Sequence, residues 1–186
     1  MANYPSDEQL AEMVRQLTQA RIENWLGECF GTWRWWLLVA LLIMPWIAWF
    51  KLVEKKKIVE LSLYGIIIMV VTITLDEVGF VLSMWHYPLD VFPMLPRLTS
   101  IDYALLPVTY MLIYQYFSSW KSFFRVMAIA SAFFSFIAEP LMTFLGFYQL
   151  LTWKHYYSYP IYIVLALACK WLTRIIIDME DRTKEK

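Results

Sequence analysis

Charged residues, glycine, histidine and cysteine are all scarce in this chain of 186 residues. Only 17% of the residues are charged, and the sequence holds five glycines, two histidines and two cysteines. Acidic and basic residues balance, so no excess of positive charge is available to neutralise phosphates, which excludes nucleic acid as a partner. Cys29 and Cys169 lie far apart and match no zinc-ligand spacing. The sequence therefore predicts neither a nucleic-acid-binding domain nor a cysteine-based zinc module.

Apolar and aromatic residues make up most of the chain. Hydrophobic residues account for 60% of it and aromatic residues for 18%, and the mean hydropathy is +0.50. This composition is too apolar for a soluble domain of this size. Ten tryptophans and twelve tyrosines suit the two faces of a bilayer, where an apolar ring and a polar edge are both satisfied. We therefore predict an all-α, polytopic membrane helix bundle, with the lipid bilayer as its main partner.

The N-terminal segment, residues 1–32, is polar and lacks the basic start and apolar core of a cleavable signal peptide. Ser6 and Gln9 fit a capping box. Apolar residues then recur at helical spacing, at Leu10, Val14, Leu17 and Trp25. We predict an amphipathic helix over about residues 6–30, which lies on the bilayer surface, packs on the bundle or binds a membrane-protein partner.

Five apolar segments within residues 33–178 predict about five transmembrane helices in one bundle. Most of them are long enough to cross a hydrocarbon core of about 30 Å. Three prolines within residues 83–100 predict an aromatic-rich loop, and residues 179–186 form a charged tail. The predicted spans are Trp33–Val53, Ile58–Leu82, Ile101–Phe117, Ser122–Tyr148 and Tyr156–Ile177.

The basic residues predict the orientation of the bundle. Five of them fall on the side of the N-terminus: Arg15, Arg21, Arg34, Arg97 and Lys154. Eleven fall on the other side: Lys51, Lys55, Lys56, Lys57, Lys121, Arg125, Lys170, Arg174, Arg182, Lys184 and Lys186. Among these we expect Lys170 to extend its side chain toward that end of the last span. Basic residues favour the cytoplasmic side, so we predict an outside N-terminus and a cytoplasmic C-terminus in the cell membrane.

Four acidic residues from three predicted spans share one layer near the outer boundary. Asp76 and Glu77 lie about 27 Å along the second span, Glu139 lies about 26 Å along the fourth, and Asp102 opens the third. Small residues flank two of these acids in the second and fourth spans, which lets helices approach closely there. We therefore expect Asp76 and Glu139 to face the bundle interior, where an ionised group is costly unless it is paired or protonated.

Two interpretations of this acidic layer stay open from the sequence. The acids share protons or bind a cation, for which carboxylate oxygens and nearby tyrosines suit a metal ion or an ammonium group. Alternatively they face water, cap helices or pair with Arg97 and Lys154. His86 and His155 fall in outer loops. They could bind a zinc ion together with the carboxylates, but we favour the interpretation that they form hydrogen bonds at the membrane interface.

Tyrosine stripes at the start of the third and fifth predicted spans add aromatic candidates. One stripe holds Tyr103, Pro107, Tyr110 and Tyr114, and the other holds Tyr156, Tyr157, Tyr159 and Tyr162. They wall a pocket toward the outer leaflet, or they are ordinary packing and interface residues. The candidate ligand-binding residues are therefore Asp76, Glu77, Asp102, Glu139, His86, His155, Tyr103 and Tyr159.

Several short motifs occur in order along residues 58–178: Asp-Glu-Val-Gly at 76–79, Tyr-Pro-Leu-Asp-Val-Phe-Pro at 87–93, Ile-Asp-Tyr at 101–103, Ala-Glu-Pro at 138–140 and Trp-Lys-His-Tyr-Tyr-Ser-Tyr-Pro-Ile-Tyr at 153–162. In these motifs the chain resembles an uncharacterised family of small multi-spanning membrane proteins from spore-forming Firmicutes. The N-terminal helix lies outside the resemblance. The resemblance implies architecture and habitat, and no activity.

Three functions are compatible with this sequence. The first is binding or transport of a cation or a lipid head group at an outward-facing acidic and aromatic pocket. The second is an interaction or assembly subunit of a larger membrane complex, and the third is a membrane enzyme acting on a lipid or isoprenoid with Glu139, Asp76 or Glu77 as proton donor. No catalytic, phosphate-binding or dinucleotide motif is present, so neither a catalytic residue nor a cofactor can be named.

Overall fold

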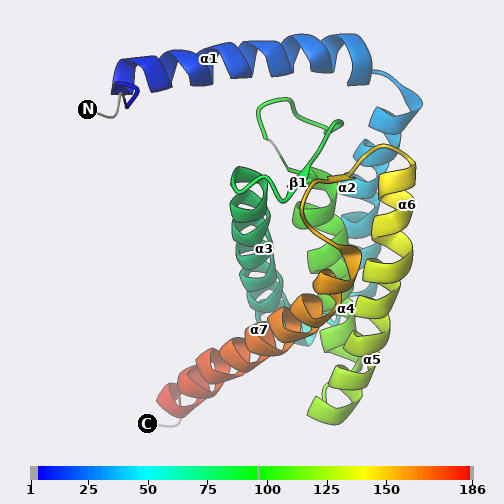
Figure 1. Cartoon of the computed structure of the whole chain (residues 1–186). Helices are drawn as coiled ribbons and strands as arrows, with labels where there is room; N and C mark the ends of the chain where they lie inside the picture. The colour runs from blue at the N-terminus through cyan, green and yellow to red at the C-terminus, as the bar shows by residue number, and fades with distance from the viewer. Residues whose placement is uncertain (1–3, 96, 185–186) are drawn as a thin grey trace.

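The computed structural model describes residues 4–95 and 97–184, which are almost entirely helical. Helix α1 (Asp7–Asn24) begins at the predicted capping box: the Ser6 side chain accepts a hydrogen bond from the Gln9 N–H, and the Gln9 side chain accepts one from the Ser6 N–H. Figure 1 shows α1 lying across one end of the bundle, at a steep angle to the other helices. None of its residues is buried, and an apolar stripe remains exposed at Leu10, Met13, Val14 and Leu17.

The bundle itself consists of α2 (Trp33–Leu52), α3 (Ile58–Val81), α4 (Leu106–Tyr116), α5 (Trp120–Phe133), α6 (Glu139–Phe144) and α7 (His155–Lys184). A π-helical turn, Phe134–Ala138, joins α5 to α6. The N- and C-termini lie at opposite ends of the molecule (Figure 1). Within the described residues, four helical segments are long and apolar enough to cross a membrane: Trp33–Leu52, Lys55–Val81, Trp120–Phe144 and His155–Thr183. The predicted all-α membrane helix bundle is confirmed.

The third predicted span is shorter than the other four. It consists of a π-helical turn, Ile101–Leu105, followed directly by α4. Together they extend about 24 Å, against about 30 Å for the hydrocarbon core. Most residues of α4 are buried against other helices: Leu106, Pro107, Val108, Tyr110, Met111 and Tyr114. The segment therefore serves as the interior helix of the bundle, around which the four longer helices pack.

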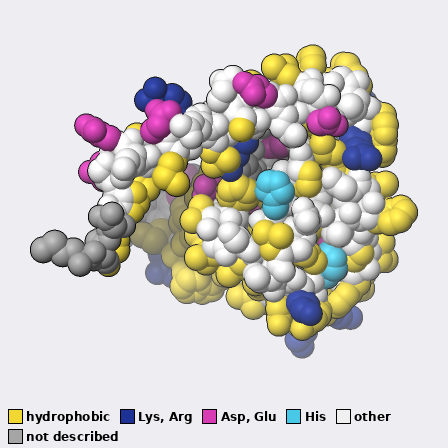
Figure 2. Space-filling view, turned by 45° about the horizontal axis from the view of Figure 1, so that its top comes forward, with side chains coloured by type: hydrophobic (Ala, Val, Ile, Leu, Met, Phe, Trp, Pro, Cys, Tyr) yellow, Lys and Arg dark blue, Asp and Glu magenta, His cyan; other side chains and the backbone are white. Residues whose placement is uncertain are grey.

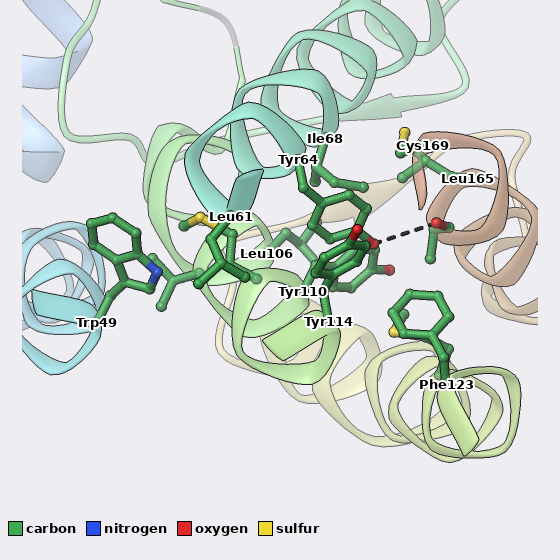
Figure 3. Close-up of a cluster of buried hydrophobic side chains, with 14 residues drawn as sticks. Trp49, Leu61, Tyr64, Ile68, Leu106, Tyr110, Tyr114, Phe123, Leu165 and Cys169 are labelled. Atoms are coloured by element: carbon green, nitrogen blue, oxygen red, sulfur yellow. Dashed lines mark hydrogen bonds between the residues drawn. The ribbon is translucent and has the colours of Figure 1, made fainter. Parts of the chain in front are cut away.

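Aromatic side chains from three helices form the centre of the core (Figure 3). The rings of Tyr64 and Tyr114 stack with centroids 4.5 Å apart, and the Tyr64 hydroxyl donates to the carbonyl of Ala166 at 3.3 Å. A Cβ atom at Gly65 would lie 2.4 Å from the sulfur of Met111, so glycine is needed for α3 and α4 to approach this closely. Tyr110 and Tyr114 belong to this core, which agrees with the second interpretation of their stripe, ordinary packing.

The Lys170 side chain extends toward the predicted end of the last span, where it reaches the turn between α4 and α5, but it is fully buried there. Its ammonium group donates to the carbonyls of Phe117 at 3.3 Å and Ser118 at 2.8 Å, and it lies 4.0 Å from the centre of the Phe123 ring. The last carbonyls of a helix have no partner within the helix. The Lys170 ammonium group thus donates hydrogen bonds to backbone carbonyls at the C-terminal end of α4. These hydrogen bonds lie inside the bundle, away from solvent.

Two short strands, which the sequence did not predict, join the loops at the α1 end of the bundle. Strand β1 (Trp85–His86) pairs antiparallel with β2 (Gln149–Leu150). The fourth predicted span was expected to reach Tyr148, but its helix ends at Phe144 because Gly146 adopts a φ of +79° and turns the chain toward β2. We call the end that carries α1, β1 and β2 the hairpin end, and the opposite end, at Lys55–Lys57, the lysine end.

Helix α7 continues through much of the predicted charged tail. It ends at Lys184, whereas the predicted span stopped at Ile177. Lys186, which was counted among the basic residues of that side, lies outside the described residues.

Candidate functional site

A cavity of about 520 Å³ lies in the hairpin-end half of the bundle. Its walls come from α2, α3, α4, α6, α7 and both loops of that end. Three of the predicted acids, Asp76, Asp102 and Glu139, line it together. Carboxyl groups that are widely separated in the sequence therefore face one space.

Local helix geometry brings two of these acids to the cavity. Asp102 lies within the π-helical turn Ile101–Leu105, and Glu139 directly follows the turn Phe134–Ala138. A proline comes shortly after each turn, and proline has no N–H to donate to the preceding turn. At Pro107 the carbonyl thus freed is that of Tyr103, which accepts instead from the indole N–H of Trp46 at 3.0 Å. Such turns contain an extra residue and change the direction of neighbouring side chains.

Asp76 is held by two aromatic side chains from the loop after α3. Its Oδ1 atom accepts from the indole N–H of Trp85 at 3.0 Å and from the hydroxyl of Tyr87. Burial raises the pKa of Tyr87 well above its usual range, so this hydroxyl keeps its proton. The Oδ2 atom of Asp76 is buried and has no hydrogen-bond partner among the described residues. Asp76 therefore retains one free acceptor.

Asp102 has a second such acceptor. Only 6% of its surface is exposed, and its Oδ2 atom is buried without a hydrogen-bond partner in the described part of the chain. The nearest basic group is Arg97, which interacts electrostatically with both aspartates. Its guanidinium, however, is paired with Glu77 at 2.5 Å, and neither Arg97 nor Glu77 lines the cavity. Glu77 is thus a partner of Arg97, as one of the two interpretations of the acidic layer allowed.

Glu139 differs from the two aspartates because its carboxylate is fully occupied. Its Oε1 atom accepts from the Tyr162 hydroxyl at 2.6 Å. Its Oε2 atom accepts from the Ser158 hydroxyl at 3.1 Å and lies 3.1 Å from Nδ1 of His155. All three partners lie in the first turns of α7. Glu139 therefore fixes the start of α7 against α6 and contributes negative charge to the cavity wall.

The remaining candidate residues lie away from the cavity. His86 is exposed and faces the Phe80 ring, Tyr103 offers only its carbonyl to Trp46, and the Tyr159 ring packs on Phe136. Figure 2 shows both histidines, in cyan, at the surface of the hairpin end. Within residues 4–95 and 97–184, no three His, Cys, Asp or Glu side chains are placed to hold a metal ion. This arrangement does not favour the zinc interpretation.

Among the aromatic residues of the cavity wall that the sequence analysis missed, four lie in the loops: Trp85, Tyr87, Tyr148 and Trp153. They come from the two loops, and the rings of Tyr87 and Tyr148 stack at 5.5 Å with an interplanar angle of 20°. The sequence signal for Trp85 and Tyr87 was the aromatic, proline-containing loop at residues 83–100, which does not indicate the direction of their side chains. Tyr148 and Trp153 are not close to any proline. The loop pairing through β1 and β2 brings them together over the acids.

Asp90 is a further buried acid that the sequence analysis missed. Its side chain accepts from the Val91 N–H at 2.6 Å and the Thr99 hydroxyl at 2.9 Å, and its carbonyl accepts from the Trp25 indole at 2.9 Å and the Cys29 thiol at 3.3 Å. Burial raises the pKa of Asp90 to about 7, although these side-chain hydrogen bonds act in the opposite direction. Asp90 thus connects the segment after α1 to the loop that covers the cavity.

Comparisons with known proteins found no matching family model, no matching curated protein and no matching solved structure. The resemblance to a family of Firmicutes membrane proteins therefore stays a prediction.

Gly79→Ala should disturb the hydrogen bond between Trp85 and Asp76. A Cβ atom at this position would lie 2.0 Å from the Trp85 ring, so the indole must move. We expect a loss of about 1–3 kcal/mol in the free energy of unfolding, measured in detergent micelles. Gly27→Ala is the matched control, because nothing lies within 4 Å of a Cβ atom there. An equal loss in both variants would contradict this account of Gly79.

Asp90→Asn should alter how stability depends on pH. The folded protein keeps the Asp90 proton up to about pH 7, whereas the unfolded chain loses it near 3.8, so the wild type should lose stability as pH rises between these values. The asparagine amide resembles the neutral acid and does not titrate, so this dependence of stability on pH should disappear in the variant. Since one pKa unit equals about 1.4 kcal/mol, the variant should be more stable above pH 7 by on the order of 2–4 kcal/mol.

Thermal unfolding from pH 4 to pH 8 measures this effect, with the exposed Asp181→Asn as control. Parallel stability profiles for the wild type and Asp90→Asn would show that Asp90 is not the titrating group.

Proposed function

We propose that the cavity binds a positively charged group and that the protein is a membrane-embedded binding or transport module. The observation that carries the proposal is the pair of buried oxygen atoms, Oδ2 of Asp76 and Oδ2 of Asp102, that have no hydrogen-bond partner among the described residues. Glu139 adds a third carboxyl group, and none of the residues lining the cavity is Lys, Arg or His. A buried carboxylate without a partner is costly, and a bound cation offsets that cost.

An organic ammonium group fits this wall better than a bare metal ion. The described residues provide no cluster of three metal ligands. The cavity wall includes the rings of Trp85, Tyr87, Tyr148 and Trp153, and aromatic faces attract ammonium groups. Catalysis has less support, because Glu139 is hydrogen-bonded through both oxygens.

Tetramethylammonium tests this proposal, with tert-butanol as a neutral molecule of similar shape. The protein in phosphatidylcholine nanodiscs should unfold at a higher temperature with tetramethylammonium and not with tert-butanol. Asp76→Asn and Asp102→Asn should each weaken this binding about tenfold or more, since a tenfold change needs only about 1.4 kcal/mol of lost ion pairing. Glu28→Gln, an exposed acid of the same end, should leave it unchanged. Equal binding in the wild type and both aspartate variants would refute a cation site in the cavity.

We also propose that the hairpin end faces outside and the lysine end faces the cytoplasm. By sequence, eleven basic residues fall on the side of the lysine end, Lys55, Lys56 and Lys57 among them, whereas five fall on the side of the hairpin end. In intact cells, a membrane-impermeant maleimide should label a Glu8→Cys variant, and it should label Asp181→Cys only after lysis. Both native cysteines are buried and give little background. The reverse labelling pattern would invert the topology.

A further inference from the structure

The cavity is far larger than a small cation requires. Its volume of about 520 Å³ lies within the range of about 300–1,000 Å³ typical of pockets for drug-sized ligands. Beyond the three acids, its wall is mainly aliphatic and aromatic. A small hydrated ion would leave most of this apolar surface without contacts. The ligand that matches the whole cavity carries an apolar body as well as a charge.

The routes into the cavity differ in character. Toward the hairpin end it is covered by the two loops, which are joined by β1 and β2 and by hydrogen bonds from the backbone of residues 151–153 to the carbonyl of Met84. Along its sides, several apolar lining residues are also exposed on the surface of the spans. These are Leu75 at 46% and Val78 at 50% in α3, Leu141 at 51% in α6 and Ile161 at 38% in α7. Such side chains contact acyl chains in a membrane, so at these positions a single layer of side chains separates the cavity from the bilayer.

The floor of the cavity is formed by the bundle core. Leu165 of α7 and Leu106 of α4 both line the cavity and belong to the central hydrophobic cluster. The cavity therefore has acids and aromatic rings among its walls and an apolar floor, against which Phe134 also packs. This division matches a molecule with an amine at one end and a hydrocarbon body at the other.

We infer that the ligand is an amphiphilic amine dissolved in the bilayer, which enters between the spans. Its ammonium group binds to the free oxygens of Asp76 and Asp102, and its hydrocarbon body extends toward Leu165. This inference rests on the proposed function, because it assumes that the cavity binds a cation. It adds the source of the ligand, which is the membrane, and the requirement for an apolar body.

Dodecylamine tests the inference in the same nanodiscs, with 1-dodecanol as the neutral amphiphile and tetramethylammonium as the water-borne cation. We expect dodecylamine, but not dodecanol, to raise the unfolding temperature of the wild type. Leu165→Phe shortens the apolar part of the cavity and should weaken dodecylamine binding about tenfold while leaving tetramethylammonium binding unchanged. Leu172→Phe, an exposed leucine of the same helix, is the control and should affect neither ligand.

The outcomes separate the two proposals. If tetramethylammonium binds and dodecylamine does not, the amphiphile inference is overturned and the cation site stands. If Leu165→Phe and the wild type bind dodecylamine equally, the hydrocarbon body does not occupy the cavity, which also overturns the inference. If dodecanol binds as well as dodecylamine, the ammonium group does not determine the binding of the amphiphile, and the inference is overturned. If neither cation binds, the proposed function fails as well.

Discussion

The cost of burying carboxyl groups inside a membrane bundle is the constraint on which the hairpin-end half of this protein depends. Removing an ionised acid from water costs several kcal/mol unless hydrogen bonds or an opposite charge offset it. The protein meets this cost in three ways. Glu77 is paired with Arg97, Glu139 accepts from donors at the start of α7, and Asp76 accepts from Trp85 and Tyr87 on one oxygen only. The free oxygens of Asp76 and Asp102 therefore differ from the carboxylates of Glu77 and Glu139, which have partners.

The covering loops are part of the same arrangement. Residues 83–100 contribute Trp85 and Tyr87 to Asp76, and Asp90 ties this loop to the segment after α1 through Trp25 and Cys29. The N-terminal helix is therefore connected to the cavity through one loop. At the lysine end, polar groups are satisfied differently: Lys170 donates to two carbonyls past α4, and Tyr114 donates to Glu60 at 2.5 Å. The polar groups named at the lysine end are thus hydrogen-bonded, whereas the cavity in the hairpin-end half keeps carboxylate oxygens without a partner among the described residues.

Most of the helical framework was predictable because hydrophobic length and capping are local properties. The capping box at Ser6, the start of α2 at Trp33 and the start of α3 at Ile58 were all predicted from neighbouring residues. Most errors fell where contacts between distant segments decide the outcome. The pairing of β1 with β2 and the burial of Lys170 each depend on a partner dozens of residues away, whereas the end of α6 is set locally by Gly146.

The sequence by itself determined that this chain is a membrane helix bundle with acids from three segments at one depth, because apolar length and rise per residue fix depth along a helix. Only the tertiary structure decided which acids face one another. Side-chain direction depends on helix rotation, and the two π-helical turns near Pro107 and Pro140 change that rotation in a way that spacing along the chain does not indicate. Asp102 and Glu139 line the cavity for this reason. Asp76 lines it from the regular helix α3, whereas Glu77, the next residue, pairs with Arg97 outside it.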